Sequence, residues 1–257
     1  MKLHHIVILV NDLAKAMEEY QDYGFKVMQG GVHKGGLSEN ALILLEDGTY
    51  LELLFIRKTL KTFVLRFLYK AGLLNGFKKS RKYGLVYRFY GRAFDSKGGI
   101  IDYALEAGDI DIIKSTEDRG IEMTTPLNAA RRKPDGSIVT WKMFTPFIGE
   151  LPFLITAFDK QKNPDEQWYQ HPNGARGIEC VSIMTGEKDR VSMFYQKFFN
   201  THAQRGVNSM MFTPDYGRIE IHEQDDPEVN KSYSYSIQLK VSDKTNDCLD
   251  NLPNWIQ

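Results

Sequence analysis

Apolar runs and polar turns alternate through the first part of the chain in a regular order. The apolar, β-branched run 3–10 predicts a strand. Asp12 follows it as a candidate N-cap, and Gly24 stands where a helix often ends on a residue with positive φ. The helix between them carries an apolar face made by Leu13, Met17 and Tyr20.

Three short strands are expected after this helix. They are predicted over 25–28, 41–45 and 50–56. Gly30-Gly31 closes the first, and the Gly-containing turn 46–48 joins the other two. The first part of the chain therefore has the order β-α-β-β-β.

The same order returns further along. Its predicted elements are a strand over 100–107, a helix from 109 to 120, and strands starting at Met123, over 137–144 and over 153–158. Asp109 is the candidate cap of this helix. Laying Asp12 on Asp109 (109 − 12 = 97) aligns strand, cap and helix without a gap. Such internal repetition indicates a modular fold.

A third copy of this order is predicted to begin after residue 176. It comprises a strand over 178–184, a helix over 188–199 and a hairpin near Tyr216-Gly217. A strand over 233–241 and a helix over 245–252 open a fourth copy, in which the sequence ends.

This repetition predicts a division of the chain into domains. We expect one domain over 1–175, built from modules 3–56 and 99–159 with an insertion over 57–98. Residues 176–257 would form further modules of the β-α-β-β type, the last of them incomplete.

The insertion differs in charge from everything around it. Residues 57–94 hold eleven Lys or Arg and no Asp or Glu, which leaves 22 basic and 33 acidic residues elsewhere. Apolar residues recur at helical spacing, namely Leu60, Phe63, Val64, Phe67, Ala71 and Leu74. The favoured interpretation is a surface helix that docks by this apolar face and leaves its lysines in water. The alternative is a lid, or a patch that attracts anionic substrates or gives weak membrane-surface association through 57–92.

Composition narrows the class of protein. Hydrophobic residues are 42% and charged residues 26%, as in globular proteins, and 33 basic residues balance 33 acidic ones, so no global charge indicates a nucleic-acid partner. Neither a signal peptide nor a membrane-spanning apolar stretch is recognised. Cys180 and Cys248 are expected to be free thiols. A cytoplasmic protein is the expectation.

Several short stretches together resemble the glyoxalase-like domain family of the vicinal oxygen chelate superfamily, which includes glyoxalases, bleomycin resistance proteins and dioxygenases. These stretches are His5-Ile6-Val7, Asn11-Asp12-Leu13, Tyr23-Gly24-Phe25, Gly30-Gly31-Val32-His33 with Asn40, Tyr50-Leu51-Glu52-Leu53, Pro134-Asp135-Gly136 with Trp141, Leu151-Pro152-Phe153, and His171-Pro172-Asn173-Gly174-Ala175. The resemblance implies an α+β fold in which paired β-α-β-β-β modules form half-open sheets around a cleft, here with a helical basic insertion between the first two modules. It does not select among lyases, isomerases, dioxygenases, thiol transferases and binding proteins.

The resemblance also implies metal ligands on the first and last strands of a module, which here are His5 and Glu52. Strand alternation places His5 on the cleft face and leaves Ile6 and Ile8 to cover the helix. The 97-residue offset offers Asp102 as a third ligand. The fourth position falls on Thr156 or Ile155, where Thr is a poor ligand. Zn, Fe, Mn or Ni would suit such a site.

Other polar residues are candidates for substrate contact. His33 and Asn40 flank the Gly-rich turn, and His33 is a candidate acid or base near neutral pH. The alternative for this segment is a Gly-rich hairpin tip. Ligand-contact candidates on the second copy are Arg131, Arg132 and Trp141, which together would hold an anionic, planar molecule. His171 is expected to stabilise its own loop.

Two functions follow from these candidates. The first is a metal-dependent lyase, isomerase or dioxygenase acting on a small oxygenated or electrophilic metabolite, with His33 as proton shuttle. The second is a metal-free protein that binds or sequesters a small anionic molecule. A homodimer is a further candidate. No phosphate-binding Gly loop, Cys-x-x-Cys pair or nucleophile elbow supports another chemistry.

Overall fold

The computed structural model describes residues 1–158, 164–215, 217–224, 233–242 and 252–256. The first module comprises β1 (Lys2–Val10), α1 (Leu13–Asp22), β2 (Met28–His33), β3 (Ser38–Leu44) and β4 (Tyr50–Ile56). The insertion holds α2 (Leu60–Lys70), the short 3-10 helix η1 (Asn75–Phe77) and α3 (Gly84–Asp95). The second module comprises β5 (Gly99–Glu106), α4 (Ile112–Asp118), β6 (Leu127–Arg132), β7 (Ile138–Phe144) and β8 (Phe153–Ile155).

The two modules close into one barrel. Its strand order is β1-β4-β3-β2-β6-β7-β8-β5, with antiparallel pairs β1–β5 and β2–β6 joining the halves. The predicted α+β class and module order are confirmed. The sheets close further than the expected half-open arrangement, so the barrel leaves no free strand edge.

The register of the central strands confirms the predicted offset. His5 of β1 faces Ala104 of β5, and Val7 faces Asp102. Adding 97 to His5 gives Asp102, and subtracting 97 from Ala104 gives Val7, so the offset converts the first pair into the second with its partners exchanged. The two modules are therefore related by an approximate two-fold axis that passes between β1 and β5.

The rest of the chain forms a second sheet. Its elements, after the short 3-10 helix η2 (Glu166–Tyr169), are β9 (Ala175–Thr185), α5 (Lys188–Phe199), β10 (Gln204–Arg205), β11 (Ser209–Phe212), β12 (Arg218–Glu223) and β13 (Tyr233–Val241). The order is β10-β11-β12-β9-β13, and β13 pairs antiparallel with β9 as β5 does with β1. The order β-α-β-β-β thus recurs in β9, α5, β10, β11 and β12, and β13 follows it.

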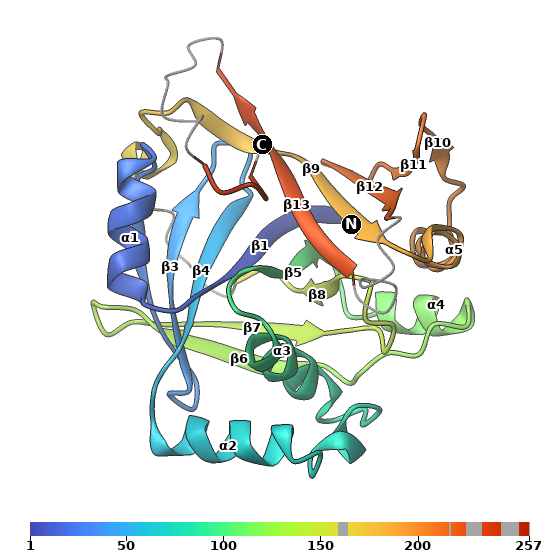
Figure 1. The fold of residues 1–257 in the computed structure, drawn as a ribbon, viewed down its shortest axis with the longest axis horizontal. Helices are drawn as coiled ribbons and strands as arrows, with labels where there is room; N and C mark the ends of the chain where they lie inside the picture. The colour runs from blue at the N-terminus through green and yellow to red at the C-terminus, as the bar shows by residue number, and fades with distance from the viewer. Residues whose placement is uncertain (159–163, 216, 225–232, 243–251, 257) are drawn as a thin grey trace.

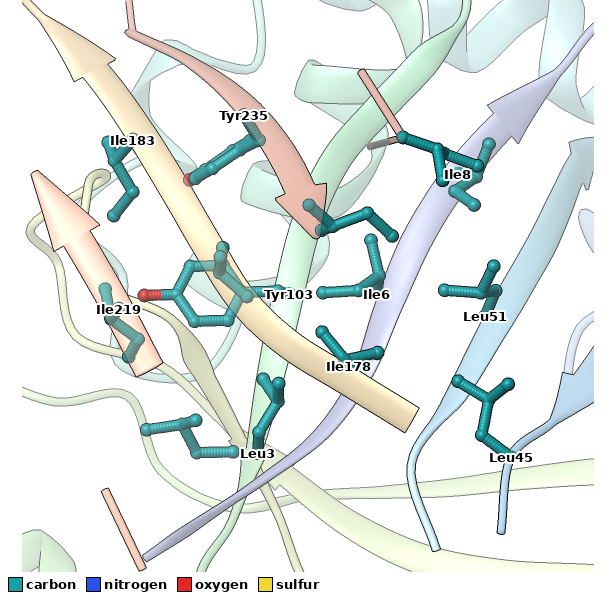
Figure 2. Close-up of a cluster of buried hydrophobic side chains, with 14 of the residues drawn as sticks. Leu3, Ile6, Ile8, Leu45, Leu51, Tyr103, Ile178, Ile183, Ile219 and Tyr235 are labelled. Atoms are coloured by element: carbon teal, nitrogen blue, oxygen red, sulfur yellow. The ribbon is translucent and has the colours of Figure 1, made fainter. Parts of the chain in front are cut away.

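A hydrophobic core joins the second sheet to the barrel. Figure 2 shows Ile6 of β1 beside Tyr103 of β5, with Ile8 further along β1 and Ile178 and Tyr235 of the second sheet in the same cluster. The outward residues of β1 therefore cover the second sheet, which corrects the prediction that they cover α1. That helix lies on β3 and β4 instead, at the side of the barrel in Figure 1.

Several predicted boundaries are accurate because local signals decide them. The Asp12 side chain accepts a hydrogen bond of 3.1 Å from the backbone N–H of Lys15, as an N-cap does. Gly24 has φ +79°, which other residues rarely adopt. The bounds of α5 and β13 agree with those predicted. Cys180 is free and buried, as expected.

Other boundaries were predicted wrongly. Gly30-Gly31 lie inside β2 rather than after it. Helix α4 begins at Ile112, after Asp111, so Asp109 is not its N-cap. Met123 makes only an isolated bridge to Pro146, and β8 is shorter than the predicted 153–158. The predicted helix 245–252, apart from its last residue, lies outside the described residues, as do Tyr216 and Cys248.

Closure of the barrel requires glycine at position 31. Gly31 has φ +135°, and a Cβ there would overlap the carbonyl oxygen of Arg132 on β6. Gly35 also has positive φ, +94°, but a Cβ there would meet nothing within 4 Å. A side chain at position 31 would therefore suffer both backbone strain and a steric clash, whereas one at position 35 would suffer backbone strain alone.

We predict that Gly31→Ala lowers the free energy of unfolding by about 3 kcal/mol or more, because strain and clash add at the β2–β6 junction. Gly35→Ala is the matched control, with an expected loss of about 1 kcal/mol from strain alone. Urea unfolding followed by circular dichroism measures both. Equal losses in the two variants would contradict the role given to Gly31.

Candidate functional site

A cavity of about 340 Å³ lies inside the barrel. Its polar end is formed by strands of both modules, and α3 of the insertion lines it with Leu85, Val86, Phe89 and Tyr90. Apolar and aromatic side chains with a few convergent polar groups are typical of small-molecule sites. The barrel interior is therefore the candidate functional site.

Neighbouring strands bring His5 and Glu52 together. Strands β1 and β4 are parallel, with Val7 opposite Glu52, and His5 points to the same face as Val7. The Nε2 atom of His5 lies 3.5 Å from Oε2 of Glu52. Both residues line the cavity. The sequence-based placement of this pair is therefore correct in geometry.

His33 and Asn40 complete the surroundings of the carboxylate. The amide of Asn40 donates a hydrogen bond of 2.5 Å to Oε1 of Glu52. The Nε2 atom of His33 lies 3.5 Å from the same oxygen and 3.4 Å from the amide nitrogen of Asn40. The two imidazoles thus approach different oxygens of Glu52, which lies between them.

Each of these imidazoles is oriented by a neighbour. Nδ1 of His5 is 2.7 Å from Nδ1 of His4, and its ring stacks on Tyr50 with centroids 4.6 Å apart. Nδ1 of His33 is 3.0 Å from the hydroxyl oxygen of Ser38. With Nδ1 engaged in this way, Nε2 is the nitrogen that both rings present to Glu52.

The cluster keeps Glu52 ionised although the residue is buried. Burial alone would raise the pKa of Glu52, but the hydrogen bond from His5, the charges of His33 and His5, and the hydrogen bond from Asn40 outweigh it and hold the pKa at about 2. Burial lowers the pKa of His33, and it lowers the pKa of His4 well below its usual value. The cavity therefore holds an ionised carboxylate beside His33, whose pKa is lowered by burial.

A glycine makes room for the amide that binds this carboxylate. A Cβ at Gly30 would overlap the side-chain oxygen of Asn40. The Gly-rich segment is thus part of the barrel wall behind the cluster, rather than a hairpin tip. Its remaining glycines, Gly35 and Gly36, do form a turn, with positive φ at both positions.

Arg131 lies at the same polar end. Its side chain is buried, and its Nη1 donates a hydrogen bond of 3.4 Å to the side-chain oxygen of Asn40. Its Nε has no hydrogen-bond partner, and within the described ranges no carboxylate forms an ion pair with its guanidinium. The indole Nε1 of Trp141 is also buried without a partner and lines the same cavity.

Asp102 does not join the site. Its carboxylate accepts two hydrogen bonds of 2.8 Å from Arg88 and lies 2.6 Å from Nη1 of Arg92. Both arginines come from α3 of the insertion, which the module alignment does not include. The prediction of Asp102 as a third metal ligand is therefore wrong in geometry, because two buried guanidinium groups already neutralise it.

The fourth predicted ligand position is corrected as well. Val7 pairs with Glu52, and its counterpart Ala104 pairs with Phe153. The structural equivalent of Glu52 is therefore Phe153, an apolar residue, and neither Thr156 nor Ile155. The Thr156 hydroxyl instead accepts a hydrogen bond of 3.0 Å from the backbone N–H of Lys142.

These placements bear on the metal that the fold family implies. Among the residues that the structure describes, no group of three or more His, Cys, Asp or Glu is arranged to hold a metal ion. His5 and Glu52 remain from the expected set, while the second module supplies an ion-paired aspartate and a phenylalanine. The donor set does not fit the expected four-ligand centre.

The remaining predicted residues lie elsewhere. Arg132 is exposed on β6 and does not line the cavity. His171 accepts a hydrogen bond of 3.0 Å from the backbone N–H of Lys26, and its Nε2 lies 2.7 Å from the carbonyl oxygen of Leu44. It holds its loop against the barrel, as expected from the sequence.

Several cavity residues were missed in the sequence. Tyr50 begins β4 and stacks on His5, and Lys34 lies at the end of β2. The α3 residues 85, 86, 89 and 90 recur at helical spacing, which could have indicated an apolar face.

Comparisons with known proteins agree with this architecture. A family model described as a glyoxalase-like domain matches residues 3–199. A hypothetical protein from Staphylococcus aureus has a similar structure, with a TM-score of 0.71 at 16% identity, and the match covers 94% of this chain and 92% of that chain. No curated protein matches the sequence.

Two enzymes share the fold at lower similarity. A mutant of 4-hydroxymandelate synthase from Streptomyces coelicolor has a TM-score of 0.54 at 11% identity, covering 94% of this chain and 72% of that one. A fusion of a xylose isomerase-like TIM barrel with a 4-hydroxyphenylpyruvate dioxygenase has a TM-score of 0.52 at 13% identity, covering 94% of this chain and 37% of that one. At these identities the likeness shows the fold alone.

The closed barrel of paired β-α-β-β-β modules defines a vicinal oxygen chelate protein. Within that superfamily, the chain belongs to the glyoxalase-like domain family. None of the described helices is long and apolar enough to cross a membrane.

The low pKa of Glu52 makes stability depend on pH. A carboxylate whose folded pKa lies below its unfolded value stabilises the fold above the unfolded pKa and loses that contribution as pH falls through the folded pKa. For Glu52 this window extends from about 4.5 down to about 2. The shift corresponds to about 3 kcal/mol.

We therefore predict that Glu52→Gln flattens the decline of the unfolding free energy between pH values of about 4.5 and about 2. Urea unfolding across this range measures the slope. Glu39→Gln, on neighbouring β3, is the control, because among the described residues the Glu39 carboxylate forms an ion pair with Arg57 alone. The same slope in wild type and Glu52→Gln would contradict the ionised state assigned to Glu52.

Proposed function

We propose that this protein binds a small, mostly apolar molecule with one anionic group inside the barrel, and that it does so without a metal ion. The observation that carries this proposal is Arg131, a buried guanidinium at the cavity without a carboxylate partner among the described residues. Buried charges are normally paired, because leaving water is costly. A ligand anion would supply the missing partner.

The hydrogen-bonding groups near Arg131 support the same ligand class. Its Nε and the indole N–H of Trp141 are donors without partners, and both residues line the cavity. Arg presents donors in a fixed planar fork that suits carboxylates and phosphates. An anionic group beside Arg131 would supply the partner that this guanidinium lacks among the described residues.

The rest of the cavity favours an apolar, flat molecule body. Phe89 and Tyr90 of α3, with Phe153 and Phe158, give it aromatic walls. Its volume of about 340 Å³ is near the lower end for small-molecule sites. A one-ring or two-ring aromatic acid has the required size and polarity.

Glu52 would orient such a ligand. Its ionised carboxylate repels an anion, so the anionic group is directed to Arg131, while a hydroxyl or another donor of the ligand can bind Glu52. His33 lies between these regions, with Nε2 3.5 Å from Glu52 and its ring centroid 6.3 Å from that of Trp141. This arrangement distinguishes the two ends of the ligand.

A metal-dependent lyase, isomerase or dioxygenase is the second candidate function. The observation that favours it is the approach of two imidazole Nε2 atoms to one carboxylate, each at 3.5 Å. Its weakness is that the second module contributes Phe153 and the ion-paired Asp102 where ligands are expected. The two candidates differ in metal content and in ligand binding under chelation.

We predict that benzoate stabilises the wild-type protein in a thermal-shift assay containing a chelator, and that benzamide stabilises it less. The two probes have nearly the same shape, so the difference reports the charge. Arg131→Gln should weaken benzoate binding roughly 10- to 100-fold because it removes a charge-assisted hydrogen bond. Arg132→Gln, on the exposed neighbour, should bind benzoate like the wild type. Equal binding by Arg131→Gln and wild type would contradict the proposal.

Metal analysis separates the two candidates directly. We predict that purified wild type, His5→Ala and Glu52→Ala hold the same low metal content by plasma mass spectrometry. A stoichiometric metal in the wild type that is lost from both variants would instead support the metal-dependent enzyme. Circular dichroism of each variant confirms that it is folded before the comparison.

A further inference from the structure

Helix α2 presents its apolar face to solvent. Leu60 is 79% exposed, Phe63 70% and Phe67 63%, and Val64 between them is also exposed. These residues follow the spacing of one helical face. The prediction that α2 docks by this face is therefore wrong, and Figure 1 shows the helix at an outer edge of the molecule.

The opposite side of α2 holds the helix in place. Tyr69 donates a hydrogen bond of 2.6 Å to Asp95 at the end of α3, and Lys70 forms an ion pair of 2.7 Å with the same residue. Thr59 caps the helix start, and Thr62 is buried beside it. The outward direction of the apolar stripe is thus fixed by specific contacts.

The sequence around this apolar stripe is rich in cations. Six exposed residues on α2 and on the segments next to it form no ion pair among the described residues: Lys58, Lys61, Arg66, Lys78, Lys79 and Lys82. No Asp or Glu occurs between 57 and 94. Exposed apolar residues on a helix, with cations on that helix and on the segments next to it, are the features of an interfacial helix that binds anionic lipid.

A groove beside α2 has the same charge. It has a volume of about 800 Å³ and lies between α2 and the ends of β1, β4 and α3. Its basic residues are Arg57, Lys58, Arg66 and Lys97, and no acidic residue lines it. Phosphate headgroups would find several cations at this position, next to the apolar side chains of α2.

We propose that α2 docks the protein on the surface of a membrane containing anionic lipid, with Phe63 and Phe67 in the interface and the neighbouring lysines and arginines on the headgroups. This goes beyond ligand binding in the barrel, since it needs neither Arg131 nor Glu52. The positive charge of this face favours anionic lipid over a second copy of the chain as the partner of α2. A symmetric contact between two copies would place this basic face against itself and bring like charges together.

The test is flotation of the protein with vesicles of phosphatidylglycerol and phosphatidylcholine in equal parts, compared with vesicles of phosphatidylcholine alone. Wild type should float with the anionic vesicles, and binding should fall as salt is added. Binding to neither kind of vesicle, or equal binding to both, would overturn the proposal.

Variants separate the apolar and the charged contributions. Phe63→Ser with Phe67→Ser should reduce binding at least about tenfold through lost apolar burial. Lys61→Gln with Arg66→Gln should reduce it roughly tenfold or more. Matched controls are Val207→Ser, which removes a fully exposed apolar side chain elsewhere, and Lys15→Gln with Lys114→Gln, which removes two exposed cations elsewhere. Wild-type binding by the α2 variants would contradict the proposal.

The same variants test the other occupant of this face. Analytical ultracentrifugation of wild type and Phe63→Ser with Phe67→Ser shows whether the apolar stripe joins two copies. A wild-type dimer that the substitutions convert to a monomer, without vesicle binding by either, would assign α2 to self-association and overturn the membrane proposal. An unchanged oligomeric state together with lost flotation supports it.

Discussion

Strand β1 is buried on both faces, and this constraint determines where the polar groups of the barrel lie. Its inward side chains line the barrel, while Ile6 and Ile8 pack under the second sheet. A slip of one residue would exchange the two faces and place His5 in the apolar layer between barrel and sheet. The pairing of β1 with β5 on one side and β4 on the other prevents that slip. The position of His5 is thus a consequence of packing on the opposite face.

The two modules place and neutralise their buried carboxylates differently. In the first, Glu52 is surrounded by hydrogen-bonding groups at a cavity and stays ionised. In the second, Asp102 is neutralised by Arg88 and Arg92, and Phe153 replaces the carboxylate of the last strand. The barrel therefore has one polar end and one internal ion-paired cluster. The approximate two-fold symmetry of the backbone does not extend to its chemistry.

The features that could be predicted from the sequence are those that local patterns determine. Alternation along β1 and β4 places His5 and Glu52 on one face, and the 97-residue offset matches the register between the modules. The offset fails at the last strand, because the second module has longer connections and pairs Phe153 where equal spacing would not place it. The offset also gives no sign that Asp102 forms ion pairs with arginines of an inserted helix, because that helix has no counterpart in the first module. Helical periodicity predicts the apolar face of α2 but not what that face contacts.

The insertion connects the interior of the barrel with its outer edge. Helix α3 lines the cavity with Leu85 and Phe89, while its other contacts hold α2 through Asp95 and the ring of Tyr87 against Tyr69. Residues 57–94 hold eleven cations and no acidic residue, against a net excess of eleven acidic residues in the remainder of the chain. An anionic surface would attract the insertion and repel the rest, so it would orient the molecule with α2 toward the surface.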